Sequence, residues 1–227
     1  MDSIMHLLQF TDSTFPVGTF SFSNGLETAA CEHVVHDAAT LESYTRAVAL
    51  QAAFSDGVAA LLAYRAAAEG RYDDIKLVDN RIMLFKMNDE ARLMLARMGK
   101  KLAELGIRLF KDNSIITRWL ADIEAGVTPG SYPVAQGIVF ALAGIDESRL
   151  YASHQYGVIN MVLSAALRCV RVSHYDTQEI LFRLSGAVPD LYRRARSMKF
   201  EDMNSFVPQM DIMASLHEKG NMRMFMN

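Results

Sequence analysis

The chain has few of the residues that mark disulfide-rich, secreted or membrane proteins. Its 227 residues include only two cysteines, Cys31 and Cys169, which form no C-x-x-C motif and cannot build a disulfide framework. The start, Met1-Asp2-Ser3, lacks the basic region that precedes the apolar core of a signal peptide. No stretch approaches the roughly 20 consecutive apolar residues of a transmembrane helix. We therefore expect a cytoplasmic protein.

The chain also lacks the glycine-rich motifs that bind phosphate. Gly18 and Gly25 are too far apart for G-x-G-x-x-G, and no Gly-Lys-Ser/Thr follows them. Ser21 and Ser23 lack the flanking glycines of a nucleophile elbow. A Ser-His-Asp or Cys-His arrangement stays open, since its members meet only in the fold, but no local motif places a nucleophile. The residues alone therefore favour a protein that is not an enzyme.

Basic residues are scarce in the first part of the chain and abundant in the next. Residues 1–80 carry 4 Lys/Arg and 11 Asp/Glu, whereas residues 81–118 carry 9 Lys/Arg and 4 Asp/Glu. The overall net charge of −3 argues against general nucleic-acid binding. The asymmetry either steers a protein partner or reflects the solvated faces of helices, and the second reading is the commoner one.

Apolar residues spaced by three and four predict helices along almost the whole chain. We expect one helix over residues 40–69, ended by Gly70, and another over residues 114–125, ended by Gly126. Between them lies the clearest apolar stripe, which consists of Leu84, Met87, Ala91, Met94, Met98, Leu102 and Leu105.

The second half of the chain continues the helical pattern. Two glycines and two prolines predict a loop over residues 126–133, followed by a short helix that stops at Gly144. Asp146 is expected to cap a long helix, and Asp176 to cap the next in a capping box with Glu179. With no alternating strand and no repeat, we expect a single-domain, all-α helical bundle of roughly eight to ten helices. The domain would span residues 1–207, and residues 208–227 would form a tail that belongs to it when docked.

The block from Phe15 to Glu27 is the most informative stretch of the chain. Phe15, Pro16, Gly18 and Phe20 specify a backbone shape whose aromatic rings need a place to dock. Asn24 is then predicted as the N-cap of a helix, with Glu27 reaching back in a capping box. The block is either a loop that packs on the core or a binding surface.

The C-terminal tail is unusually apolar, because seven of the 14 methionines lie in residues 198–227. Residues 208–218 predict a short amphipathic helix. The apolar end should dock on its own domain or on a partner, and we favour a partner. Arg223, flanked by apolar residues, suits an interface arginine better than an arginine supplied in trans to a nucleotidase.

One short segment gathers possible metal ligands. Cys31, His33 and His36 lie within seven residues, and the two histidines could share a helical face. No second ligand pair lies nearby in the sequence, so a structural role is favoured. His154, on an apolar helix face, is expected to be a hydrogen-bonded core histidine.

Five motifs in order resemble those of the UreF family of urease accessory proteins, nearly from end to end. They are Leu7-Leu8-Gln9 with Phe15-Pro16-Val17-Gly18, Phe20-Ser21 and Gly25-Leu26-Glu27; Glu90 and Arg92 through Met98-Gly99; Tyr132-Pro133-Val134 and Gly137; Tyr156 through Asp176, Gln178 and Leu181; and Asp211-Ile212, His217-Glu218, Arg223 and Phe225.

The resemblance implies an all-α, usually dimeric accessory protein with no catalytic activity, cofactor or metal of its own. Family members bridge UreD (also called UreH) and the GTPase UreG, and help deliver nickel to apo-urease. Two alternatives remain: a regulator of UreG acting through Arg223, and a direct nickel chaperone acting through Cys31, His33 and His36. The residues then expected to bind partners are Phe15, Pro16, Gly18, Phe20, Gly25, Glu27, Asp211, His217, Glu218, Arg223 and Phe225.

Overall fold

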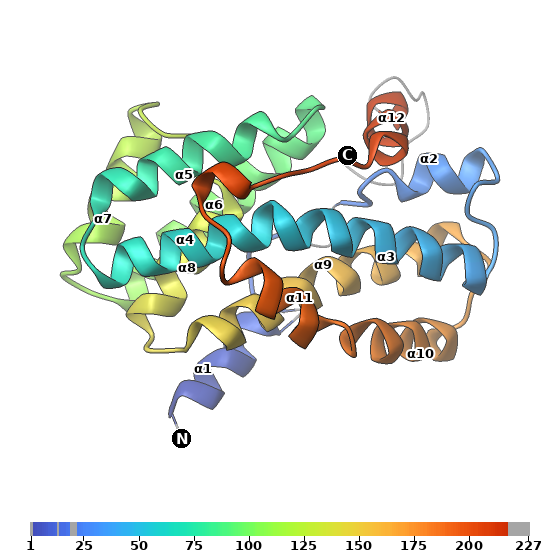
Figure 1. Ribbon diagram of the computed structural model, residues 1–227, viewed down its shortest axis with the longest axis horizontal. Helices are drawn as coiled ribbons and strands as arrows, with labels where there is room; N and C mark the ends of the chain where they lie inside the picture. Colours follow the sequence, from blue (N-terminus) through green and yellow to red (C-terminus); the bar gives the residue numbers. More distant parts are fainter. Residues whose placement is uncertain (1, 13, 19–21, 218–227) are drawn as a thin grey trace.

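The computed structural model describes residues 2–12, 14–18 and 22–217, and all the regular structure in them is helical (Figure 1). The prediction of an all-α protein is therefore confirmed. In chain order the α-helices are α1 (Asp2–Thr11), α2 (Leu26–Cys31), α3 (Ala38–Phe54), α4 (Asp56–Ala68), α5 (Tyr72–Leu84), α6 (Asp89–Leu109), α7 (Ser114–Glu124), α8 (Tyr132–Leu142), α9 (Glu147–Cys169), α10 (His174–Ser185), α11 (Val188–Ala195) and α12 (Pro208–His217).

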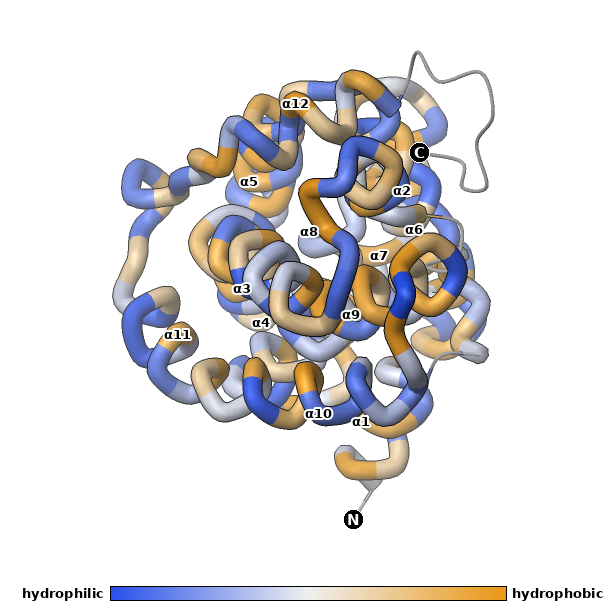
Figure 2. The backbone as a smooth tube through the Cα atoms, turned by 90° about the vertical axis from the view of Figure 1, so that its right-hand side faces the viewer, coloured by the Kyte–Doolittle hydropathy of each residue, from blue (hydrophilic) through white to orange (hydrophobic). Residues whose placement is uncertain are grey.

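The centre of the molecule is formed by α3, α4, α8 and α9, and the other helices surround them (Figure 2). The most extensive packing in the described residues joins α4 to α8, and α8 also packs against α6. The helices α4 and α8 supply many of the side chains with almost no exposed surface. Burial of this apolar surface is the main driving force for the fold.

Two glycines allow the backbones of neighbouring segments to come into direct contact. A Cβ atom on Gly137 of α8 would lie 2.5 Å from the carbonyl oxygen of Ala60 in α4. A Cβ atom on Gly99 of α6 would lie 2.0 Å from the carbonyl oxygen of Gly130, in the loop before α8. Real Cβ atoms do not come this close to backbone atoms, so only glycine fits at either position.

The loop before α8 is fixed by a buried carboxylate on α5. Asp79 has no exposed surface and accepts hydrogen bonds from Thr128 Oγ1 at 2.7 Å, Gly130 N at 2.9 Å and Ser131 N at 2.7 Å. Burial raises the pKa of this carboxyl, although the three donors act in the opposite direction. Asp79 therefore positions the segment that leads into Tyr132, inside the predicted loop.

The single helix predicted over residues 40–69 is two helices, because the backbone turns at Ser55 (φ −111°, ψ −81°). Tyr151 of α9 donates its hydroxyl hydrogen to the carbonyl oxygen of Ala53 at 3.1 Å. Asp56, the next residue after Ser55, accepts a hydrogen bond from Lys86 Nζ at 2.6 Å. These tertiary contacts compete with helix continuation. The break also helps to explain why there are more helices than the eight to ten expected.

The stretch from Ala38 to Ala68 is long and apolar enough by composition to cross a membrane, contrary to our expectation that no stretch approaches a span. However, 67% of its most apolar window is buried inside the protein, as in the core helices of soluble proteins.

One predicted helix start agrees with the structure and another does not. Asp146 caps α9 by accepting from the backbone of Ser148 and Arg149, as expected. The capping box of α10 is formed by Ser173 with Asp176 at its third position, so the prediction of Asp176 as the N-cap was wrong by three residues. Ser173 starts the helix earlier because its hydroxyl accepts from the backbone of Asp176 at 3.2 Å.

The apolar stripe of α6 begins later than predicted. Asn88 caps α6, which leaves Leu84 and Met87 outside the helix with 71% and 67% of their surface exposed. Met94, Met98 and Leu102 are buried, which confirms the stripe over the rest of its length.

Candidate functional site

The C-terminal helix α12 docks against the end of the N-terminal block (Figure 1). Gly25 has a positive φ of 76°, and a Cβ atom on it would lie 2.9 Å from the backbone nitrogen of Ala214 in α12. Tyr44 of α3 donates its hydroxyl hydrogen to the carbonyl oxygen of Asn24 at 2.7 Å, which holds this turn in place. Residues 208–217 therefore form the predicted helix, and this part of the tail docks on its own domain.

A histidine between two glutamates joins three distant parts of the chain. His217, the last residue of α12, places Nε2 2.8 Å from Glu27 Oε2 and Nδ1 3.0 Å from Glu90 Oε2. The three side chains are buried, with residue exposures of 3%, 5% and 8% for His217, Glu27 and Glu90. Buried carboxylates are stabilised only when they are paired and hydrogen-bonded. We call the three side chains the clasp.

Glu27 takes part in the clasp and does not cap its own helix, contrary to the prediction from the sequence. Gly25, not Asn24, occupies the N-cap position of α2, and no side chain caps this helix. The predicted capping box between Asn24 and Glu27 was therefore wrong. Glu27 lies in the first turn of α2, and its carboxylate contacts the imidazole ring of a residue 190 positions later.

A cavity of about 120 Å³ lies beneath α12, between α3, α6, α8 and α9. Methionines from three helices line it (Met94, Met98, Met161 and Met210) together with polar groups. Asp211 lines the cavity from α12, and burial raises the pKa of its carboxyl. Burial also raises the pKa of Asp56, but Lys86 and other neighbours outweigh this and lower it overall. The cavity is large enough and polar enough to hold a few water molecules.

His154 borders this cavity and is the hydrogen-bonded core histidine expected from the sequence. It is 4% exposed, and its Nδ1 lies 2.8 Å from Gln136 Oε1. Because Gln136 Oε1 only accepts, Nδ1 carries the ring hydrogen. Nε2 has no partner in the part of the chain that the structure describes.

The buried ring of His154 should make the protein sensitive to acid. Burial lowers its pKa from 6.5 to about 4. Between these values the unfolded chain binds a proton that the folded chain does not, so stability falls as pH drops from 6.5 to 4. We expect a loss of roughly 3 kcal/mol across this range, and a correspondingly shallower pH dependence in His154→Gln. Urea denaturation at several pH values measures it, and parallel pH profiles would contradict the assignment.

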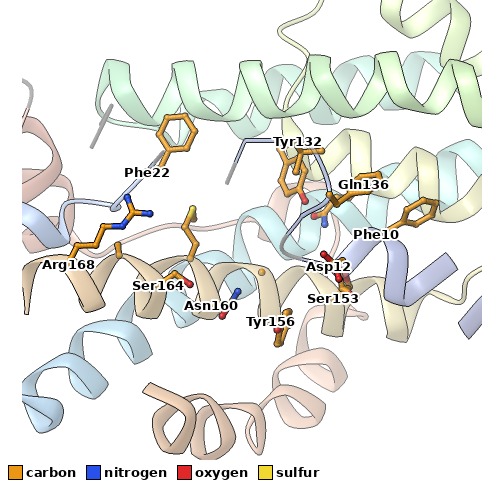
Figure 3. A pocket seen from close by; sticks show the side chains of 16 residues that line it. Phe10, Asp12, Phe22, Tyr132, Gln136, Ser153, Tyr156, Asn160, Ser164 and Arg168 are labelled. Carbon is orange, nitrogen blue, oxygen red and sulfur yellow. The ribbon is translucent and has the colours of Figure 1, made fainter. Parts of the chain in front are cut away.

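The first part of the N-terminal block lies away from the clasp, over a second, smaller cavity of about 50 Å³ against α9 (Figure 3). Phe15 contributes to its lining, and its ring centroid lies 5.5 Å from that of Phe10. Pro16 and Gly18 are exposed. The opposite wall carries polar side chains of α9, which include Ser153, Tyr156, Asn160, Ser164 and Arg168.

The structure therefore brings together only part of the predicted partner-binding set. Gly25, Glu27 and His217 meet at α12, and Asp211 faces the cavity on the same helix. Phe15, Pro16 and Gly18 lie apart from them. Phe20, Glu218, Arg223 and Phe225 lie outside the described residues, so their roles stay predictions.

Cys31, His33 and His36 are exposed at the end of α2 and do not form a ligand set. His36 Nδ1 lies 3.2 Å from the carbonyl oxygen of His33, and its Nε2 lies 3.6 Å from Asp37. Within the described residues, no group of three or more His, Cys, Asp or Glu side chains is placed to hold a metal ion.

Two residues that are important for the structure, Glu90 and Asp79, were not predicted as such from the sequence. Glu90 was recognised only as part of a motif, although a glutamate in the first turn of a helix with an apolar stripe could have been marked as buried. Asp79 shares a helix with the buried Ile75, Val78 and Ile82, and its spacing from them already indicates an inward-facing carboxylate.

Comparison with known proteins identifies the family of this chain. The UreF family model matches residues 35–185. Urease accessory protein UreF 2 of Brucella canis is 44% identical over 227 residues, which cover 100% of this chain and 93% of the relative. UreF 1 of Brucella melitensis is 43% identical, covering 100% and 94% of the two chains, and UreF of Yersinia pestis is 42% identical, covering 99% and 98%. The chain belongs to the UreF family of urease accessory proteins.

Proposed function

We propose that this protein is a cytoplasmic, non-catalytic adaptor that bridges UreD (UreH) and the GTPase UreG during nickel-dependent maturation of urease. The observation that carries the proposal is the clasp. Glu27, Glu90 and His217 come from three separate family motifs and meet in one buried contact. A contact of this kind fixes the position of α12 on the domain, which suits a protein that binds its partners around this helix.

Exposed apolar side chains around α12 support a docking role. Ile212 and Leu216 of α12 are 55% and 48% exposed. Leu84 and Met87 are exposed at the α5–α6 turn, whose Lys86 borders the same cavity as Asp211. Large apolar side chains gathered at one end of a protein are typical of a protein–protein interface.

Replacing Gly25 with alanine tests whether partner binding depends on the docked helix. The added methyl group meets the backbone of α12, so we expect α12 to be displaced and co-purification with UreD and UreG to fall at least tenfold. Gly70→Ala is the matched control, because Gly70 has a similar φ of 72° and a Cβ atom there would have no atom within 4 Å. The control carries the same backbone strain but should bind normally.

A chain ending at Val207 gives the limiting case, since it lacks α12 altogether. Normal partner binding by this chain, or equal binding by Gly25→Ala and Gly70→Ala, would contradict the proposal. Circular dichroism of each variant establishes that the remaining helices are folded.

We also propose that the protein forms a homodimer through a groove of about 950 Å³ between α1, α9 and α10. The apolar and aromatic residues that line it include Leu7, Leu8, Tyr156 and Leu163. Small side chains on α9, such as Ala152 and Ser164, would allow another helix to approach closely. The mass in solution tests this proposal directly.

A further inference from the structure

We propose that the clasp is a proton-dependent latch: docking of α12 takes up one proton, so the helix is released as pH rises above about 6.5. The observation is that both ring nitrogens of His217 face carboxylate oxygens, Nδ1 at 3.0 Å from Glu90 and Nε2 at 2.8 Å from Glu27. The proposal concerns docking of α12 itself and requires no partner protein.

The proton count follows from the geometry. Each of the two N···O contacts needs a hydrogen atom between nitrogen and oxygen. A neutral imidazole carries only one N–H group, so the second hydrogen must be an additional proton, either on the ring or on one of the carboxyl groups. The closed clasp of Glu27, His217 and Glu90 therefore holds two protons, whichever atom carries the second one.

The undocked state holds fewer protons at neutral and alkaline pH. A solvent-exposed imidazole loses its second proton near pH 6.5, and exposed glutamates lose theirs near pH 4.3. Above about pH 6.5 docking therefore takes up one proton, and its equilibrium constant falls about tenfold per pH unit. Below about pH 4.3 the undocked glutamates bind protons as well, so docking weakens again in acid. Docking is strongest between these limits.

Other titratable groups near the clasp lie on α3, α6, α9 and α12. The pKa of the Cys169 thiol is raised to about 11 by burial, with Glu27 and Cys31 contributing, and burial also raises the pKa of Tyr44, so both keep their protons at neutral pH. Asp89 and Arg92 form an ion pair at 2.5 Å on the exposed side of α6. Burial also raises the pKa of Asp211, which faces Lys86. The raised pKa values of Asp211, and at higher pH those of Cys169 and Tyr44, act in the same direction as the clasp.

The Glu90→Gln variant separates the clasp from Asp211. A glutamine amide supplies its own hydrogen to Nδ1 of a neutral ring, while Nε2–H still donates to Glu27. Docking of α12 in this variant then needs no additional proton. Any pH dependence that remains belongs to the other titratable groups around α12, which include Asp211 and Cys169.

Hydrogen–deuterium exchange of the full chain measures docking directly. The protection of residues 208–217 is compared with that of α3 in the same sample, after correction for intrinsic exchange rates, from pH 6 to pH 9. In the natural sequence we expect the relative protection of α12 to fall about tenfold per pH unit above pH 7. In Glu90→Gln we expect it to change by less than about threefold over the whole range.

A flat profile in the natural sequence would overturn the proposal, and so would an equally steep profile in Glu90→Gln. If Glu90→Gln leaves α12 unprotected at every pH, Glu27→Gln provides the equivalent test from the other side of the ring. Loss of docking in both amide variants also contradicts the latch, because either amide should replace the missing proton. Under the proposed function, on which this last consequence rests, partner binding weakens with rising pH. Failure of that consequence alone would leave the exchange result intact.

Discussion

Replacing Gly99 or Gly137 with alanine is expected to destabilise the protein by about 3 kcal/mol or more. A Cβ atom at Gly99 would lie 2.0 Å from the carbonyl oxygen of Gly130, and one at Gly137 would lie 2.5 Å from that of Ala60. In both cases the obstacle is backbone, which cannot rotate away as a side chain can. Alanine gains up to about 1 kcal/mol of helix propensity, which is too little to offset the separation of two packed helices.

Gly157→Ala provides the matched control. Gly157 also lies inside a long helix, but a Cβ atom there has nothing within 4 Å. Its replacement should be neutral or stabilising by about 0.5–1 kcal/mol. Urea denaturation of the three variants gives the comparison, and a similar stability for Gly99→Ala and Gly157→Ala would show that the helices can move apart at low cost.

The second large effect is expected for Asp79→Ala. The substitution removes the acceptor of three buried hydrogen bonds, two of them from backbone nitrogens of Gly130 and Ser131. These donors belong to buried residues, so each one left unpaired costs about 1–3 kcal/mol. We expect a total loss of about 3–5 kcal/mol and a loosened loop before α8.

Asp73→Ala on the same helix is the control for Asp79. The Asp73 side chain is 88% exposed and pairs with Lys76 at 3.2 Å, so its removal should change stability by less than about 0.5 kcal/mol. Denaturant unfolding monitored by circular dichroism measures both variants. Equal stabilities would mean that water replaces the carboxylate of Asp79 in the loop.

The sequence predicted the parts of the fold that depend on neighbouring residues. Asp146 caps a helix and Gly70 ends one because capping and positive φ are local properties. The break at Ser55 lies in an alanine-rich stretch with strong helix propensity. It coincides with contacts from distant residues, Tyr151 to the carbonyl oxygen of Ala53 and Lys86 to Asp56, and no local pattern contains that information.

In the site, too, local signals could be read from the sequence but long-range contacts could not. The capping rule assigned Glu27 to its own helix, because that rule considers only residues within one turn. Its actual partner, His217, is 190 positions away, and Glu90 is 127 positions from the same histidine. The family motifs contain all three residues, and Glu27 and His217 were expected to bind partners, but only the folded chain shows that the three side chains touch one another.

This separation also determines when the clasp can form during synthesis. The chain leaves the ribosome from its N-terminus at about 5–20 residues per second, so Glu27 emerges roughly ten seconds or more before His217. Loops this long close slowly, because their ends must find each other against chain entropy. The clasp therefore cannot form in the nascent chain until His217 has emerged. The helix α12 completes a contact whose first residue, Glu27, lies in the first quarter of the chain.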